Sequence, residues 1–150
     1  MSPPPTPPAV APQKIPNRFI IHVTLFFAPE HVPLALDACR TLFSEAWKDP
    51  RLDFCQVVQD ADEPGTIRIQ EGWNASRRYL DEVQLHKPYY IPYLQATEHL
   101  WIKPRVIEIF ERLSEWTWIK PSFEKDFGVA SSAAIDISES SDGRLQRGNE

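Results

Sequence analysis

Hydrophobic and polar residues recur with the periods of strands and helices through the middle of the chain. Four runs of β-branched, apolar or aromatic residues have the length of strands. They cover residues 18–28, 52–59, 66–73 and 105–113. In the third run Ile67, Ile69 and Glu71 share one side, which predicts a strand with one face buried. A further aromatic run, "EWTWIK", is compatible with a short fifth strand after the last one.

Two helical regions separate these strands. The first lies between Pro29 and Pro50, which suit a helix start and a helix stop. The second begins after Asn74 or Ser76, either of which can cap it, and is interrupted near both prolines of "KPYYIP" before it resumes. The apolar positions at helical spacing in the first region are Val32, Leu36, Cys39, Leu42, Phe43, Ala46 and Trp47.

The order of the predicted elements is strand, helix, strand, strand, helix, strand. This βαββαβ order predicts an α+β, ferredoxin-like fold, in which an antiparallel sheet carries both helices on one face. The other face then needs a cover, and Trp116 and Trp118 follow the last core strand with little of their own domain left to bury them. Because a contiguous apolar sheet face marks an interface, we expect a homodimer.

The two ends of the chain differ in composition from its middle. Residues 1–17 hold seven of the 15 prolines, which fix φ and lack an amide donor, so we expect a disordered, extended arm there. Such an arm is also able to bind an SH3-like partner. Residues 121–150 are expected to form a mostly disordered polar tail, since few large apolar residues occur beyond residue 129. The folded domain is therefore expected to span residues 18–120.

The charge and the apolar content of the chain exclude several classes of protein. Of the 150 residues, 42% are hydrophobic and 25% are charged, as in ordinary globular domains. The net charge of −5, without a basic stripe, argues against nucleic-acid binding. No apolar run approaches the roughly 18 residues that span a bilayer, and the first residues lack the apolar core of a secretion signal. We therefore expect a cytoplasmic protein that does not bind a membrane.

Motifs for metals and cofactors are missing from the sequence. Cys39 and Cys55 have no metal-ligand spacing, and each lies in an apolar pattern that predicts a buried, reduced thiol. No cluster of His, Cys and Asp has ligand spacing either. The chain has only five glycines and neither a Gly-rich phosphate loop nor a nucleotide fingerprint. We therefore expect neither a metal nor a cofactor.

The segment "EGWNASRRYLDEVQLHKPYY", residues 71–90, concentrates aromatic and titratable side chains. The core from about residue 19 to residue 110 resembles the antibiotic biosynthesis monooxygenase (ABM) family of the dimeric α/β barrel superfamily. The resemblance rests on the βαββαβ order, the strand end "IQEGW" and the helix that leads to "KPYYIPY". The "KPYY" and "KPR" segments are similar to those of fungal secondary-metabolism members. The resemblance implies a pocket between the sheet and the two helices of each subunit.

The resemblance also implies roles for side chains in this segment. In the quinone-forming branch of the family, a Trp at the strand end and a Tyr six residues later line the pocket, and Trp73 and Tyr79 have this spacing. Packing on an apolar helix face is the competing explanation for Tyr79, and Glu71 is interpreted mainly as a structural hydrogen-bond acceptor. Tyr79 and His86 are our candidate catalytic groups in this segment. The candidate substrate-binding residues are Trp73, Tyr89, Tyr90 and Tyr93.

The histidines depart from the family pattern. Many similar chains have a His directly after the proline of "KPYY", where this chain has Tyr89, and His86 fits no family position without a shift of register. His22 is a further catalytic candidate, because a His inside an apolar strand must be hydrogen-bonded or line a cavity. It shares a strand face with Thr24 and with Phe26, which we include as a candidate substrate-binding residue. The pattern does not decide which face of the sheet they occupy.

These observations predict a cofactor-independent enzyme of secondary metabolism that acts on an aromatic small molecule. An electron-rich phenol that loses its proton can reduce oxygen directly, so the protein needs only a base, a dry pocket and hydrogen bonds to the phenolate. The resemblance favours a monooxygenase with a phenolic or polyketide-derived substrate. A cyclase or isomerase that uses the same pocket for proton transfer is the first alternative. The second is a non-catalytic ABM-like dimer that binds a small molecule, since the family's histidine pattern is missing.

Overall fold

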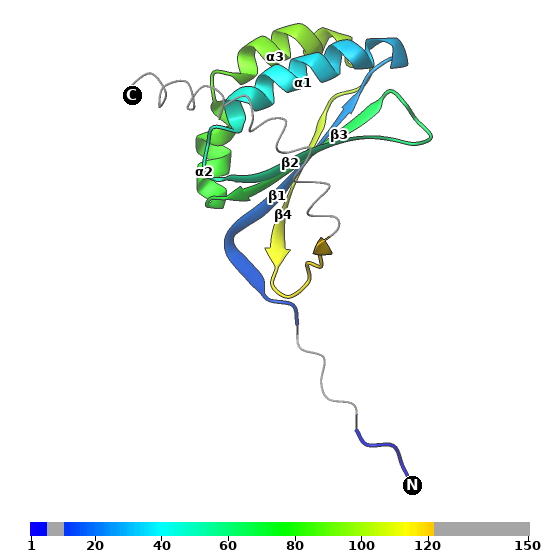
Figure 1. Cartoon of the computed structure of the whole chain (residues 1–150), viewed down its shortest axis with the longest axis vertical. Coiled ribbons are helices and arrows are strands. Elements are labelled where there is room, and N and C mark those ends of the chain that lie inside the picture. The colour runs from blue at the N-terminus through cyan, green and yellow to red at the C-terminus, as the bar shows by residue number, and fades with distance from the viewer. Residues whose placement is uncertain (6–10, 122–150) are drawn as a thin grey trace, which may run out of the picture. The chain divides into compact units, whose positions relative to one another are not determined.

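The computed structural model describes residues 1–5 and 11–121, and a four-stranded sheet forms the centre of the fold. The strands are β1 (Lys14–Phe26), β2 (Leu52–Gln59), β3 (Thr66–Asn74) and β4 (Val106–Leu113). They lie in the order β2-β3-β1-β4, and each neighbouring pair is antiparallel (Figure 1). This arrangement confirms the predicted α+β, ferredoxin-like fold.

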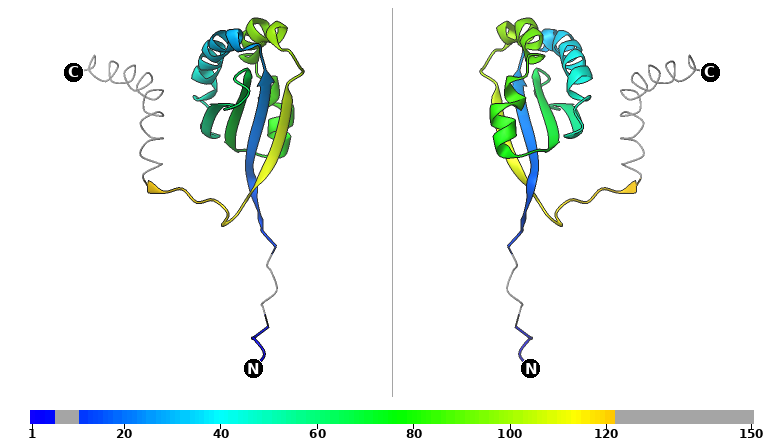
Figure 2. Two further views of the ribbon diagram at one scale, coloured as in Figure 1. Left: turned by 90° about the vertical axis from the view of Figure 1, so that its right-hand side faces the viewer. Right: turned by 90° about the vertical axis from the view of Figure 1, so that its left-hand side faces the viewer.

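The helices cover one face of this sheet (Figure 2). The helical elements are η1 (Pro29–His31), α1 (Val32–Ala46), α2 (Arg77–Glu82), η2 (Gln84–His86), α3 (Tyr90–Thr97) and η3 (Glu98–Leu100). Helices α1 and α3 lie side by side across the strands (Figure 1). The predicted apolar side of α1 is buried at Val32, Cys39, Leu42 and Ala46, whereas Leu36 is exposed.

The second helical region is divided into α2, η2 and α3. Of the two predicted caps, Ser76 is the one used, because its Oγ accepts a hydrogen bond of 3.0 Å from the Tyr79 backbone N–H. Helix α2 ends at Glu82, and the φ of −117° and ψ of −60° at its C-cap, Val83, differ from regular helical values. Pro92 does not interrupt a helix as predicted. It lies in the first turn of α3, where its missing N–H removes no helical hydrogen bond.

Alternation along the strands sends one set of side chains toward the helices. Phe19, Ile21 and Leu25 of β1 pair on this face with residues of β3. The sheet residues buried there are Phe19, Ile21, Leu25, Phe27, Leu52, Ile67, Ile69, Glu71 and Trp73. With Leu80 of α2 and the buried side of α1, they form the core of the domain.

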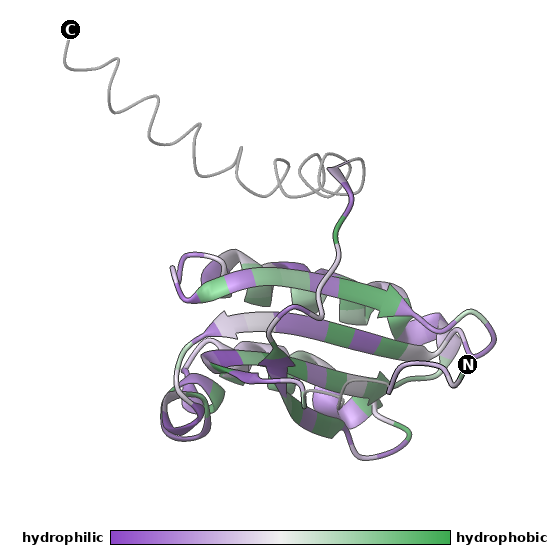
Figure 3. Ribbon diagram, turned by 90° about the horizontal axis from the view of Figure 1, so that it is seen from below, coloured by the Kyte–Doolittle hydropathy of each residue, from purple (hydrophilic) through white to green (hydrophobic). Residues whose placement is uncertain are grey.

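The opposite face of the sheet carries no helix in the described part of the chain. Figure 3 views the sheet from this side, and hydrophobic and hydrophilic bands alternate along the strands. His22, Thr24 and Phe26 of β1 lie on this face, and two residues of β4, Val106 and Phe110, are 43% and 45% exposed. We call this surface the open face. It is the surface that the sequence predicts to be covered by a second copy of the chain.

Both ends of the sheet differ from the prediction. β1 begins at Lys14 rather than at residue 18, because Lys14 pairs with Leu113 of β4 beyond an irregularity at Asn17, whose φ is 56°. After β4, Glu115 has a φ of 65° and the chain leaves the strand, so the predicted fifth strand at 115–120 is wrong. The remaining parts of the predicted arm and tail, residues 6–10 and 122–150, lie outside the described residues.

Candidate functional site

Glu71 and Trp73 stand at the end of β3, on the face that the helices cover. Strand alternation places them with Ile67 and Ile69, so a carboxyl enters an apolar layer. Only 5% of Glu71 is exposed, and the Trp73 indole Nε1 donates a hydrogen bond of 2.8 Å to Glu71 Oε2. Burial raises the pKa of Glu71 from 4.5 to about 7, although the Trp73 hydrogen bond opposes this rise. Glu71 can therefore gain or lose a proton near neutral pH.

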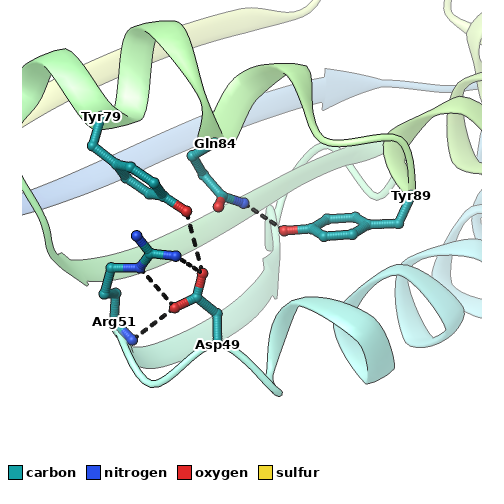
Figure 4. A network of polar contacts seen from close by, with 5 residues as sticks. All are labelled: Asp49, Arg51, Tyr79, Gln84 and Tyr89. Atoms are coloured by element: carbon teal, nitrogen blue, oxygen red, sulfur yellow. Dashed lines mark hydrogen bonds and ion pairs between the residues drawn. The ribbon is translucent and has the colours of Figure 1, made fainter.

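Gln84 of η2 links two tyrosines at the start of α3. It is fully buried, and its Nε2 donates hydrogen bonds of 2.6 Å to Tyr89 Oη and 3.0 Å to Tyr90 Oη (Figure 4 draws the first). Gln84 Oε1 has no hydrogen-bond partner among the described residues. An unpaired buried acceptor of this kind costs about 1–3 kcal/mol. A ligand or a water molecule that donates to this oxygen would remove that cost.

The same tyrosines lie within electrostatic reach of Glu71. Burial raises the pKa of Tyr90 far above its usual value of 10, and the nearby Glu71 carboxylate raises it further. Burial also raises the pKa of Tyr89; the Gln84 hydrogen bond opposes this rise, and the Glu71 carboxylate adds a smaller increase. Both hydroxyls therefore stay protonated near neutral pH and can donate hydrogen bonds.

Two thiols and a third tyrosine add further neutral groups on the helix side of the sheet. Burial raises the pKa of Cys39 to about 11, and it raises the pKa of Cys55 and Tyr93 well above their usual values. Both cysteines are free thiols, as predicted, although Cys55 is only half-buried. Tyr93 Oη and the indole Nε1 of Trp101 are buried without hydrogen-bond partners in residues 11–121. Among Glu71, these thiols and these tyrosines, only Glu71 thus has a pKa near neutral pH.

A polar network holds Tyr79 near these residues (Figure 4). Asp49, between α1 and β2, accepts hydrogen bonds from the backbone N, Nε and Nη2 of Arg51 at 2.9, 3.0 and 3.1 Å, and Tyr79 Oη donates to it at 3.4 Å. The Arg51 guanidinium also stacks 3.9 Å from the centre of the Tyr79 ring. Burial and the Asp49 carboxylate raise the pKa of Tyr79 above its usual value, so Tyr79 too remains a hydrogen-bond donor.

The structure separates the predicted site residues into two groups. His22 lies on the open face, where its ring packs edge-on against Phe110 with 5.0 Å between ring centres, and Phe26 shares that face. His86 is exposed at the end of η2. His22 and Phe26 are thus separated by the sheet from the residues that we call the helix-side cluster, which are Glu71, Trp73, Tyr79, Gln84, Tyr89, Tyr90 and Tyr93. The predicted residues that the structure brings to the helix side are Trp73, Tyr79, Tyr89, Tyr90 and Tyr93.

Some polar residues of this cluster were not predicted from the sequence. Glu71 was placed on the buried side of β3 by its alternation with isoleucines, but it was interpreted as structural. Nothing in the sequence distinguished Gln84 from an exposed helix residue. Asp49 and Arg51 flank the proline that predicted the helix stop, and their pairing with Tyr79 spans 30 residues of chain.

The described residues contain neither a cluster of metal ligands nor a helix that could span a membrane. Residues 1–5 and 11–121 hold no group of three or more His, Cys, Asp or Glu side chains that could bind a metal ion. Within the same ranges no helix is long and apolar enough to cross a membrane. The helix-side side chains include a buried carboxyl, tyrosine hydroxyls and an amide.

The fold is shared with proteins of known structure. No family model matches the sequence. The four-stranded sheet with helices on one face is nevertheless the fold of antibiotic biosynthesis monooxygenases, which confirms the predicted resemblance at the level of the fold. A protein described as a putative antibiotic biosynthesis monooxygenase from Nitrosomonas europaea superposes with a TM-score of 0.61 at 15% identity, over 71% of this chain and 98% of that one. A second, from Caulobacter crescentus, has a TM-score of 0.58 at 17% identity, over 66% and 92%.

The sequence is also similar to that of a protein named as a monooxygenase. A protein of the fungus Pestalotiopsis microspora, named as a putative monooxygenase, is 29% identical over 100 residues. The match covers 67% of this chain and 83% of the relative. The similarity thus extends over most of the folded domain.

Proposed function

We propose that this protein is a cofactor-independent enzyme that oxygenates a phenolic or polyketide-derived small molecule between its sheet and its helices. The observation that carries the proposal is Glu71, a buried carboxyl whose pKa is raised to about 7 among tyrosine hydroxyls. A carboxyl with this pKa is partly ionised at neutral pH and can act as a general base. The fold and the fungal relative support an oxygenation in particular.

The proposed reaction needs only the substrate and molecular oxygen. Glu71 removes a proton from an activated CH₂ group of the aromatic substrate, and the carbanion gives its electrons to O₂ to form a C–O bond. Glu71 returns the proton to the resulting peroxide, and loss of water then leaves a carbonyl group. Overall, R₂CH₂ and O₂ react to give R₂C=O and H₂O. The substrate therefore supplies all four electrons that reduce O₂. The hydroxyls of Tyr79, Tyr89 and Tyr90 remain protonated and can stabilise the anionic oxygen of the substrate.

A cyclase or isomerase is the second candidate function. It is favoured by the same buried carboxyl beside hydroxyl donors, because proton removal by Glu71 and proton return by a tyrosine complete such a reaction. This reaction consumes no oxygen. The two functions therefore differ in whether the reaction requires oxygen, which can be measured.

We also propose that the active form is a homodimer joined through the open face. Val106 and Phe110 are exposed on one face of the edge strand β4, and Ile107 is 36% exposed on the other. An edge strand with exposed apolar side chains on both faces needs a cover. A second copy of the sheet would bury His22 and Phe26, whose predicted contribution to catalysis would then depend on the dimer.

The test is oxygen uptake with a panel of phenols and anthrones, run in parallel with anaerobic product analysis. An oxygenase consumes one O₂ for each product molecule and stops without oxygen, whereas a cyclase or isomerase turns over at the same rate in both conditions. Glu71→Gln and Tyr79→Phe should lose turnover, and His99→Ala, an exposed substitution on η3, should not. His22→Ala should lose turnover only if the dimer contributes to the site. Ligand binding without turnover in any condition would contradict both enzymatic proposals.

A further inference from the structure

Gln84 presents one unused hydrogen-bonding atom inside the helix-side cluster. Its amide has two N–H donors and one carbonyl acceptor. The nitrogen donates to both Tyr89 and Tyr90, while the carbonyl oxygen has no partner in the described part of the chain. None of the Gln84 surface is exposed, so bulk solvent does not reach this oxygen. In Figure 4 Tyr89 points toward the Gln84 amide from the start of α3, whereas the Tyr79 hydroxyl points toward Asp49.

The two bonds from the nitrogen fix the direction of the unused oxygen. They tie η2 to the start of α3, so the amide cannot turn without the loss of two hydrogen bonds. The tyrosine oxygens accept from Gln84, which leaves their own hydroxyl protons to be donated elsewhere. The cluster thus offers an acceptor, Gln84 Oε1, next to hydroxyl donors.

We propose that Gln84 determines specificity by accepting, through Oε1, a hydrogen bond from a hydroxyl group on the aromatic substrate. The inference rests on the proposed function, because it takes the helix-side cluster as the substrate site. A hydroxyl group donates to Gln84 and accepts from a tyrosine at once, so it satisfies both kinds of group. An ammonium has no lone pair for the tyrosines. A carboxylate has no proton for Gln84, and it adds a negative charge beside Glu71, which itself resists ionisation there.

The test compares the binding of two probes, a dihydroxynaphthalene and its dimethyl ether, which has no hydroxyl donor, to the full chain by titration calorimetry. The wild type should bind the diol about tenfold more tightly than the ether, which corresponds to about 1.4 kcal/mol for one additional hydrogen bond. Gln84→Met has a similar volume and no acceptor of this kind, so it should lose the preference. Gln95→Met, the same change at an exposed position of α3, should retain it.

A second variant keeps the proposal testable if Gln84→Met does not fold. Gln84→Asn retains a buried amide but withdraws it by one methylene, and it should lose the preference as well. Equal or tighter binding of the ether to the wild type would overturn the proposal, because the amide would then present its NH₂ group or a bound water. An unchanged preference in the folded Gln84 variants, or no binding of either probe, would also overturn it. Preferential binding of the diol without any turnover would instead contradict the proposed function and leave the role of Gln84 in recognition intact.

Discussion

Ionisation of Glu71 should make the folded protein less stable as the pH rises. The carboxyl is buried in an apolar layer, and its pKa is raised from 4.5 to about 7 mainly by desolvation. Between these two values the folded chain retains the Glu71 proton and the unfolded chain loses it. The stabilising effect of protonation is therefore complete below about pH 4.5, decreases through neutral pH and is gone above about pH 8.

The size of this effect follows from the same two values. The difference between 4.5 and about 7 corresponds to about 3 kcal/mol in the free energy of unfolding, at about 1.4 kcal/mol for each tenfold change in proton affinity. Glu71→Gln has no ionisation, and its amide oxygen can still accept the Trp73 indole N–H. The difference in the free energy of unfolding between the variant and the wild type should therefore increase by about 2–3 kcal/mol from pH 5 to pH 8, in favour of the variant.

Urea unfolding followed by circular dichroism at pH 5, 6, 7 and 8 measures this difference, because the titration of all other groups cancels between the two proteins. Glu63→Gln, in an exposed turn, should show no such dependence. Trp73→Phe removes the hydrogen bond that stabilises the carboxylate, so its loss of stability should extend to higher pH. A difference between Glu71→Gln and the wild type that is constant with pH would refute the reasoning.

Two other substitutions test the N-cap of α2 and the proposed dimer contact through the open face. Ser76→Ala removes the cap of α2 and should cost about 1 kcal/mol in urea unfolding, whereas Ser44→Ala, on the exposed side of α1, should cost much less; equal costs would contradict the capping role. Phe110→Glu should convert a dimer to a monomer in light scattering, whereas Leu34→Glu, exposed on the helix side, should not. A wild-type mass of one chain would exclude the proposed dimer.

The sheet and α1 could be predicted because their hydrophobic periods are long and regular. β2 covers the predicted residues 52–59, and β3 extends the predicted strand by a single residue. The second helical region was less regular, since its apolar residues are aromatic and surround two prolines. Pro92 fits a helix start as well as a helix stop, and only the end of α2 at Glu82 decides between them.

The face on which His22 lies could not be predicted from alternation. Both sides of β1 carry large apolar residues, so the period of two assigns His22 and Phe26 to one face without saying which face the helices cover. The pairing of β1 with β3 decides the matter, because Glu71 and Trp73 are opposite Ile21 and Phe19. His22 and the predicted tyrosines thus lie on opposite sides of the sheet within one chain.

Three polar residues of the site lie between regular elements, and this explains why the sequence did not reveal them. Asp49 and Arg51 lie between α1 and β2, and Gln84 lies between α2 and α3. Such positions have no regular period that predicts burial, and the contact between Asp49 and Tyr79 spans 30 residues of chain. Connecting segments tolerate substitution better than the sheet that supports them. Changes at Gln84 should therefore alter the choice of substrate more readily than changes at Glu71, whose burial belongs to the core.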